Sequence, residues 1–558
     1  MKIDMKQKTI LFSLITMVFL INACVKDNFN FDKWDKEIDY NAGFAFPVLY
    51  GNIGFADVVE KYDKNAIMMV DEDGLVSIVY NKVVRSKDPH EIIYLPNQHT
   101  SRTIEGLNFN FAGFDSPGDS VSYSYTKHYE FDVFNDDAEL TSISLKSGTL
   151  NISAQSNFYH TARLYLTFPS ITKNGVPYSC IITFAYIGDV SNINIDFTGY
   201  TIDMTQTPQG FNEIPIDITA TLYYSGYDDH SGDVDFSVDL NNMQYEYVRG
   251  YFGTNTLIYE SGKIEITMFQ SDEVTIEDYY FKDPKFKVLY NNSYGIPTSF
   301  YFTELLLNSS IDEQDYNITH YEGGLPMDSL NPYHVSYAST IWTTVTDSLK
   351  VSKENSNIAE IIDLKPQWVQ FIAHAYTNPV GITHNNFITD ESLLEADVLI
   401  ELPLWGYLYN FRNLDTVEFK MTDAYDYDSW TPNTRVAARV FIRNGLPIEV
   451  FAKIMFVDGN YNLLDNLFLT EEEEIIKSAV VDGNGRVINF GEKAFTIELD
   501  KNRLEKIKNT KHVIFSGRGS STEAANQDIV RIYDDYRILF DIGFEIDIDD
   551  TIYLDSIN

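Results

Sequence analysis

Apolar and polar residues alternate with a period of two over many short segments of this 558-residue chain. Clear examples lie within residues 193–197, 234–240, 264–268 and 544–548. Because successive side chains of a strand point to opposite faces of a sheet, this pattern predicts strands with one buried face. Asn-Gly, Asp-Gly and Gly-Asn pairs separate many of these segments, as in turns between antiparallel strands. The expected fold is mainly β, with multi-domain antiparallel β-sandwiches and a few short helices.

Three landmarks of the C-terminal half occur twice in the same order. They are two strands joined by a Gly-apolar-Pro turn, a short helical pattern that leads into a strand, and a final alternating strand. The paired copies lie at 287–302 and 439–451, 358–371 and 504–515, and 398–402 and 538–542. A displacement of about 140 to 150 positions is an ordinary domain length, so the pattern predicts two tandem units.

Further local patterns predict turns and helices. The Gly-apolar-Pro turn occurs a third time at 174–177, and in each copy we expect the glycine to take the positive φ that reverses the chain. Helices are expected at Leu469–Val480 and Lys501–Lys508, each after an N-cap residue. We interpret Gly517–Ser521 as a polar loop and Asp482–Arg486 as a hairpin turn.

The N-terminus has the three parts of a bacterial export signal. Three lysines precede an apolar run, Ile10–Ile21, which is too short for a permanent membrane span. The run ends in a motif that resembles the lipobox read by signal peptidase II, formed here by Ile21, Asn22, Ala23 and Cys24. The resemblance implies cleavage after residue 23 and attachment to a membrane through lipid on Cys24. An ordinary signal peptide followed by a chance cysteine is the alternative.

The residues after Cys24 bear on the location. Lys26 followed by Asp27 is similar to the surface-export signal of Bacteroidota lipoproteins. This resemblance implies an outer-membrane, lipid-anchored protein exposed on the cell surface, with the periplasmic face as the alternative. The expected segments are a signal peptide at 1–23, a lipidated tether with a β-rich segment at 24–115, a β-sandwich domain at 116–272, and repeat units at 273–413 and 414–558.

Charge and cysteine content narrow the possible partners. The chain has 41 basic and 82 acidic residues, a formal net charge of −41. Such a body repels phosphate backbones, so we exclude nucleic acid as a partner. Cys180 is the only cysteine besides Cys24. We therefore expect no disulfide, and we expect Cys180 to be a small buried side chain.

Neither a catalytic nor a metal-binding motif is present. The ten histidines are scattered, and His-Glu-x-x-His, paired Cys-x-x-Cys and Gly-x-Ser-x-Gly are absent. We expect no metal, no cofactor and no enzymatic activity. A site assembled from residues distant in sequence is the alternative.

Two aromatic segments are candidate glycan contacts. Trp405, Tyr407, Tyr409 and Phe411 occupy alternate positions and would share one strand face. If exposed, this face is a stacking platform, and if buried, it belongs to the core. Trp430 ends an acidic, aromatic segment at 423–430, where rings could stack on sugars and carboxylates could bind hydroxyls. A solvated loop is the alternative for that segment.

Modification sites are also suggested by resemblance. Bacteroidota glycosylate exported proteins at Asp-Ser/Thr followed by an aliphatic residue. That triplet places possible O-glycosylation at Ser120, Ser329, Ser348, Thr416, Thr551 and Ser556.

The whole chain resembles the large lipoproteins of Bacteroidota, with a lipobox and an acidic, aromatic-rich β-body. The leading hypothesis is a non-enzymatic lipid-anchored protein that binds or scaffolds at the cell envelope, with a glycan or another envelope protein as partner. One alternative is a glycan-binding accessory of a polysaccharide-uptake system. Another is a fimbrillin-like pilus or adhesin subunit.

Overall fold

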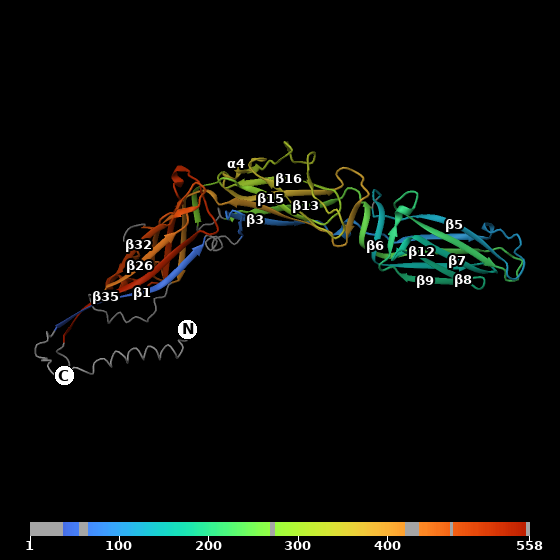
Figure 1. The fold of residues 1–558 in the computed structure, drawn as a ribbon, viewed down its shortest axis with the longest axis horizontal. Coiled ribbons are helices and arrows are strands. Elements are labelled where there is room, and N and C mark those ends of the chain that lie inside the picture. Colours follow the sequence, from blue (N-terminus) through green and yellow to red (C-terminus); the bar gives the residue numbers. More distant parts are fainter. Residues whose placement is uncertain are drawn as a thin grey trace, which may run out of the picture.

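The computed structural model describes residues 37–54, 65–134, 136–267, 274–418, 435–468 and 473–553. These residues form five large sheets of antiparallel strands and a few short helices, which confirms the expected mainly-β fold. The sheets make three modules in a row, so the molecule is elongated (Figure 1). No helix among the described residues is long and apolar enough to cross a membrane.

The distal module is built on one ten-stranded sheet that folds over its own core. Its apolar interior lies between strands of both halves of the sheet, for example Val238 and Leu240 opposite Ile214 and Phe168. Its strands are β4 (Gln98–Glu105), β5 (Ser120–Glu130), β6 (Glu139–Ser156), β7 (Thr161–Lys173), β8 (Val176–Phe184), β9 (Asp189–Asp196), β10 (Thr201–Asp203), β11 (Glu213–Tyr223), β12 (Asp233–Tyr251) and β23 (Asn386–Thr389).

The middle module packs two five-stranded sheets face to face. The first contains β2 (Ile67–Val70), β3 (Val76–Arg85), β15 (Lys285–Asn292), β21 (Val345–Val351) and β24 (Leu394–Pro403). The second contains β13 (Thr256–Glu265), β16 (Thr298–Ser309), β17 (Asp315–Asn317), β20 (Tyr333–Val335) and β22 (Pro366–Thr377). Around them lie α3 (Pro89–Ile92), α4 (Ile358–Ile362) and the small hairpin β18 (Tyr321–Glu322) and β19 (Leu325–Pro326).

The base module combines a four-stranded and a seven-stranded sheet. The first contains β1 (Glu37–Gly54), β26 (Arg435–Asn444), β32 (Gly491–Leu499) and β35 (Arg537–Tyr553). The second contains β14 (Val274–Phe281), β25 (Trp405–Glu418), β27 (Ile448–Val457), β28 (Leu463–Asn466), β29 (Glu473–Ile476), β33 (His512–Ser521) and β34 (Val530–Arg531). Helix α5 (Lys501–Ile507) and the hairpin β30 (Val480–Val481) and β31 (Val487–Asn489) complete it.

The middle and base modules share one strand order, and the repeated sequence landmarks occupy equivalent places in it. In the middle module β3, β24, β15 and β21 are neighbours, and in the base module β1, β35, β26 and β32 follow the same order. The facing sheets also correspond, with β13, β22, β16 and β17 matching β25, β33, β27 and β28. Helices α4 and α5 precede the equivalent strands β22 and β33. The duplication therefore extends to the whole sandwich.

The glycines of the three Gly-apolar-Pro turns do not share one role. Gly175 has a φ of +77° and closes the tight hairpin between β7 and β8, as expected. Gly295 and Gly445 are not among the positive-φ residues, so that expectation was wrong for them. A Cβ on Gly295 would lie 2.2 Å from the Phe387 ring, so this glycine permits close packing.

Two local expectations are wrong because pairing with distant strands overrides local preference. Within Leu469–Val480, residues Glu473–Ile476 form strand β29 and not a helix, since they pair with the edge of β27. Gly517–Ser521 is not a loop but the end of β33, held between β25 and β27. The helix at Lys501–Ile507 and the hairpin around Asp482 are confirmed.

Strand pairing crosses the boundaries expected at 115/116, 272/273 and 413/414. Strand β4 pairs with β12, β13 pairs with β22, and β25 itself contains residues 413 and 414. The division of the chain into these segments stays a prediction. Each of the five large sheets contains strands from both sides of at least one expected boundary.

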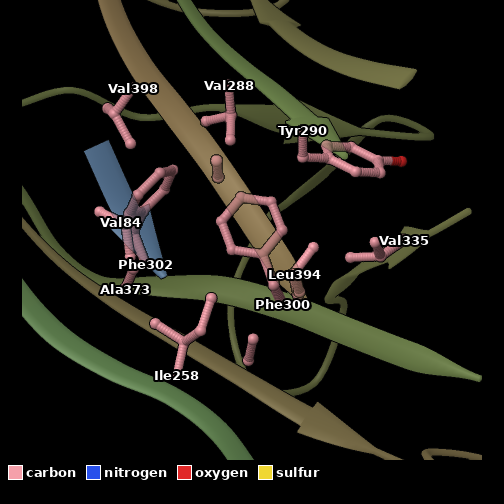
Figure 2. A pocket seen from close by; sticks show the side chains of 12 residues that line it. Val84, Ile258, Val288, Tyr290, Phe300, Phe302, Val335, Ala373, Leu394 and Val398 are labelled. Carbon is pink, nitrogen blue, oxygen red and sulfur yellow. The ribbon is translucent and has the colours of Figure 1, made fainter. Parts of the chain in front are cut away.

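A small apolar cavity lies between the two sheets of the middle module (Figure 2). Its volume is about 40 Å³, and its lining includes Val84, Val288, Phe300, Phe302 and Ala373 from four different strands. No polar group reaches it, so it is a packing void of the core.

Candidate functional site

The aromatic ladder lies on β25 of the base module, and the start of this strand shares a cavity with Ile78 of the middle module. On the opposite face of the same strand, Leu408 packs with Tyr279 and Phe281 of β14 against the apolar core of the middle module. On the ladder face, Trp405, Tyr407, Tyr409 and Phe411 are half-buried. The ladder is therefore neither a fully exposed platform nor a closed core.

Three of the four ladder rings are partly covered by residues of neighbouring strands. The guanidinium of Arg531 lies 4.3 Å from the centre of the Trp405 ring. Tyr407 stacks on Tyr280 of β14, with ring centres 5.9 Å apart. Phe411 covers Gly519 of β33, where an added Cβ would come within 2.3 Å of the ring.

Two carboxylates accompany the ladder, and sequence analysis missed both. The Tyr407 hydroxyl donates a hydrogen bond of 3.0 Å to Asp278. Partial desolvation, with repulsion from Asp278, raises the pKa of Asp363 to about 6, although the residue as a whole is exposed. Desolvation and the bond to Asp278 raise the pKa of Tyr407 to about 12.

These groups come from three separate stretches of sequence. Asp278 belongs to β14, Tyr407 to β25, and Asp363 directly follows α4. No spacing in the sequence relates them, because the pairing of β14 with β25 brings together residues more than a hundred positions apart. We call Trp405, Tyr407, Tyr280, Asp278 and Asp363 the ladder site.

An apolar cavity of about 100 Å³ adjoins the ladder site. Its lining includes Trp405 and Tyr407 together with Ile78, Phe281, Ile448 and Ile532, so both modules contribute to it. Carboxylates that accept hydrogen bonds, a tyrosine hydroxyl and half-exposed rings can together bind a hydroxylated, flat ligand. Among the described residues, no three metal-ligating side chains lie together here or elsewhere.

The remaining predicted residues are spread over the chain. Ser120, Ser329, Ser348 and Thr416 are exposed. Thr551 lies on β35 opposite Asp39. Ile21, Asn22, Ala23, Cys24, Lys26, Asp27, Trp430 and Ser556 lie outside the described residues. Cys180 is a half-buried free thiol on β8, whose pKa burial raises to about 11.

The fold and the ladder site define a protein of three β-modules in series, two of them built on one plan. Neither a known protein family nor a curated protein matches the sequence. Among solved structures, a candidate secreted protein from Parabacteroides distasonis is 9% identical, with 90% of this chain and 99% of that chain covered and a TM-score of 0.25.

Two further solved structures come from viruses. A triple jelly-roll structure from an archaeal virus is 9% identical, covering 83% of this chain and 91% of its own, with a TM-score of 0.10. One from Sulfolobus turreted icosahedral virus is 10% identical, with 77% and 91% covered and a TM-score of 0.11. At these values the similarities carry no inference about function.

Proposed function

We propose that this protein is a non-enzymatic, lipid-anchored protein of the outer membrane that projects its β-modules from the membrane to bind or scaffold other envelope components. The supporting observation is the pairing of β1 with β35, which places Glu37 opposite Tyr553. The described chain thus enters and leaves at the same extremity of an elongated body, while the distal module lies at the other (Figure 1).

The anchor fits this geometry. Cys24 precedes Glu37 by 13 residues, and a fully extended tether of that length reaches at most about 45 Å. Several acyl chains on one cysteine, at about 0.8 kcal/mol per buried CH₂ group, hold a protein almost permanently. A body fixed beside β1 presents its distal module away from the bilayer.

The test is incorporation of labelled palmitate, combined with proteolysis of intact cells. Cys24→Ala should abolish the label and release the protein from the membrane fraction. Cys180→Ala changes the only other cysteine and should keep both label and location. Label retained in Cys24→Ala would contradict the anchor, and protection of the wild type from added protease would place it on the periplasmic face.

A second candidate function is glycan binding at the ladder site. It is favoured by the half-buried rings of Trp405 and Tyr407 beside Asp278. On a glycan array, Trp405→Ala should lose any binding that the wild type shows. Trp368→Ala is a matched control, because this half-buried tryptophan of the middle module is also covered by a cation, Lys263, at 5.0 Å. Equal loss in both variants, or no glycan bound by the wild type, would remove this candidate.

A further inference from the structure

The free end of the distal module is formed by four loops, which we call the tip loops: residues 106–119, 157–160, 185–188 and 224–232. Strand register places these loops side by side, since Asp233 is paired with Glu105 and Val234 with Ser156, while Ser156 is also opposite Asp189. The other end of β12 pairs with β23 at the junction with the middle module. The tip loops are therefore the part of the described body farthest from β1 and β35 (Figure 1).

Large apolar side chains are unusually exposed on the tip loops. Leu107 is 93% exposed, Tyr186 is 65% exposed and Tyr227 is 53% exposed, and Tyr159 and Ile187 are also exposed. The rings of Tyr159 and Tyr227 lie 5.6 Å apart although they come from different loops. Exposed apolar groups that gather at one place on a surface are typical of interaction sites.

The exposed residues stand on a packed aromatic layer. Phe111 stacks on His230 at 4.7 Å, and Phe114 meets the buried His160 edge-on at 4.9 Å. The backbone N–H of Ser225 donates to Nδ1 of His160, which ties the last tip loop to the layer. Loops fixed in this way lose little conformational entropy when a ligand binds.

The charge of the tip loops has one sign. They contain four aspartates, Asp115, Asp119, Asp228 and Asp229, and neither lysine nor arginine, and Asp189 adjoins them as the first residue of β9. Asp119, Asp189 and Asp229 accept hydrogen bonds from nearby backbone N–H groups, and these bonds fix the positions of the three carboxylates. Arg163, near the start of β7, lies over the ring of Tyr223.

We propose that the tip loops bind a basic, arginine- or lysine-rich segment of another polypeptide. Tyrosine faces attract ammonium and guanidinium groups, and the aspartates supply the complementary charge. The same negative field opposes anionic lipid and nucleic acid. This inference goes beyond anchoring, because it requires no lipid and concerns the opposite end of the molecule.

The experiment measures fluorescence anisotropy of an arginine-rich peptide with the purified full-length protein. A peptide with glutamate in place of arginine should not bind. Affinity for the arginine-rich peptide should weaken as NaCl rises from about 0.05 M to about 0.3 M, because added salt shortens the Debye length and screens the attraction between the charges. Combining Tyr159→Ala with Tyr227→Ala should lower affinity about tenfold, as for aromatic residues at the centre of an interface.

The control separates the tip from the general acidity of the protein. The double variant leaves net charge unchanged, so its loss of affinity must come from the two rings. Tyr259→Ala removes a 70%-exposed tyrosine of the middle module and should bind as the wild type. Unchanged affinity in the double variant, or equal loss in Tyr259→Ala, would overturn the proposal. Binding of a neutral oligosaccharide that the double variant loses, without peptide binding, would overturn it in favour of a glycan site.

Discussion

At the scale of single residues, buried polar side chains stabilise the turns and loops. Asn292 and Asn444 are fully buried at equivalent places in the middle and base modules. Each accepts a hydrogen bond from the backbone N–H two residues later and donates its amide to nearby carbonyls. Buried amides of this kind are satisfied on both sides, which fixes the exit from β15 and from β26.

His160 carries a prediction at this scale. It is fully buried against Phe114, Tyr224 and His230, and burial, then repulsion by His230, lowers its pKa below 6.5, while Asp229 opposes the shift. The unfolded chain therefore takes up this proton more readily than the folded one. Well above pH 6.5, His160 is neutral in both states and does not affect the free energy of unfolding. As the pH falls below that value, protonation of His160 in the unfolded chain lowers the free energy of unfolding.

We expect urea unfolding of the distal module to need less denaturant at about pH 5.5 than at about pH 7.5. His160→Gln keeps an acceptor for the Ser225 N–H and should reduce this difference. His334→Gln, which removes an exposed imidazole of the middle module, serves as the control. An undiminished pH difference in His160→Gln would contradict the assignment.

At the scale of elements, strand β33 shows how neighbours give glycines unequal roles. Gly517 and Gly519 point to the same face of one central strand, and sequence analysis placed both in a loop. Nothing lies within 4 Å of a Cβ on Gly517, whereas a Cβ on Gly519 would meet the Phe411 ring at 2.3 Å. The ring thus replaces the missing side chain over the second glycine.

The two glycines make a matched pair of substitutions. Gly519→Ala should destabilise the base module by about 1–3 kcal/mol, because Phe411 must move out of its place. Gly517→Ala should be neutral or stabilising by up to about 1 kcal/mol, because alanine loses less backbone entropy than glycine. Thermal or urea unfolding measures the change in stability of each variant. Equal changes in the two variants would contradict the idea that the Phe411 ring needs the space left by Gly519.

At the scale of the whole molecule, the three modules differ in how far apart in the sequence their strands lie. Nine of the ten strands of the distal sheet lie between residues 98 and 251, and only the short β23 comes from outside. The middle module takes β2, β3 and β13 from outside residues 273–413, and the base module takes β1 from the start of the described chain.

This difference predicts which fragments fold. Residues 96–254 expressed alone should unfold cooperatively, because they contain almost all of their own sheet. Residues 273–413 alone should not, since β24 and β22 would lose the neighbours β3 and β13 and expose unpaired edges. Circular dichroism during urea unfolding distinguishes these outcomes. A disordered 96–254 fragment, or a cooperative 273–413 fragment, would contradict the prediction.

The sequence alone determined the properties that depend on local pattern. Period-two alternation identified the β fold, because side-chain direction in a strand follows from the backbone itself. The recurrence of a strand, turn and helix indicated the duplication, and the Asp482 turn and the helix after Asp500 were recognisable from their own side chains. The lipobox at Cys24 stays a prediction from its motif.

Only the tertiary structure decided what depends on long-range pairing. It turned Glu473–Ile476 into an edge strand, and it joined Asp278 to Tyr407 and Tyr159 to Tyr227. Strand partners are chosen by burial of a shared face over many residues, and that free energy is not visible in any single segment. For this reason the ladder site and the tip loops emerge from the sheets and not from a motif.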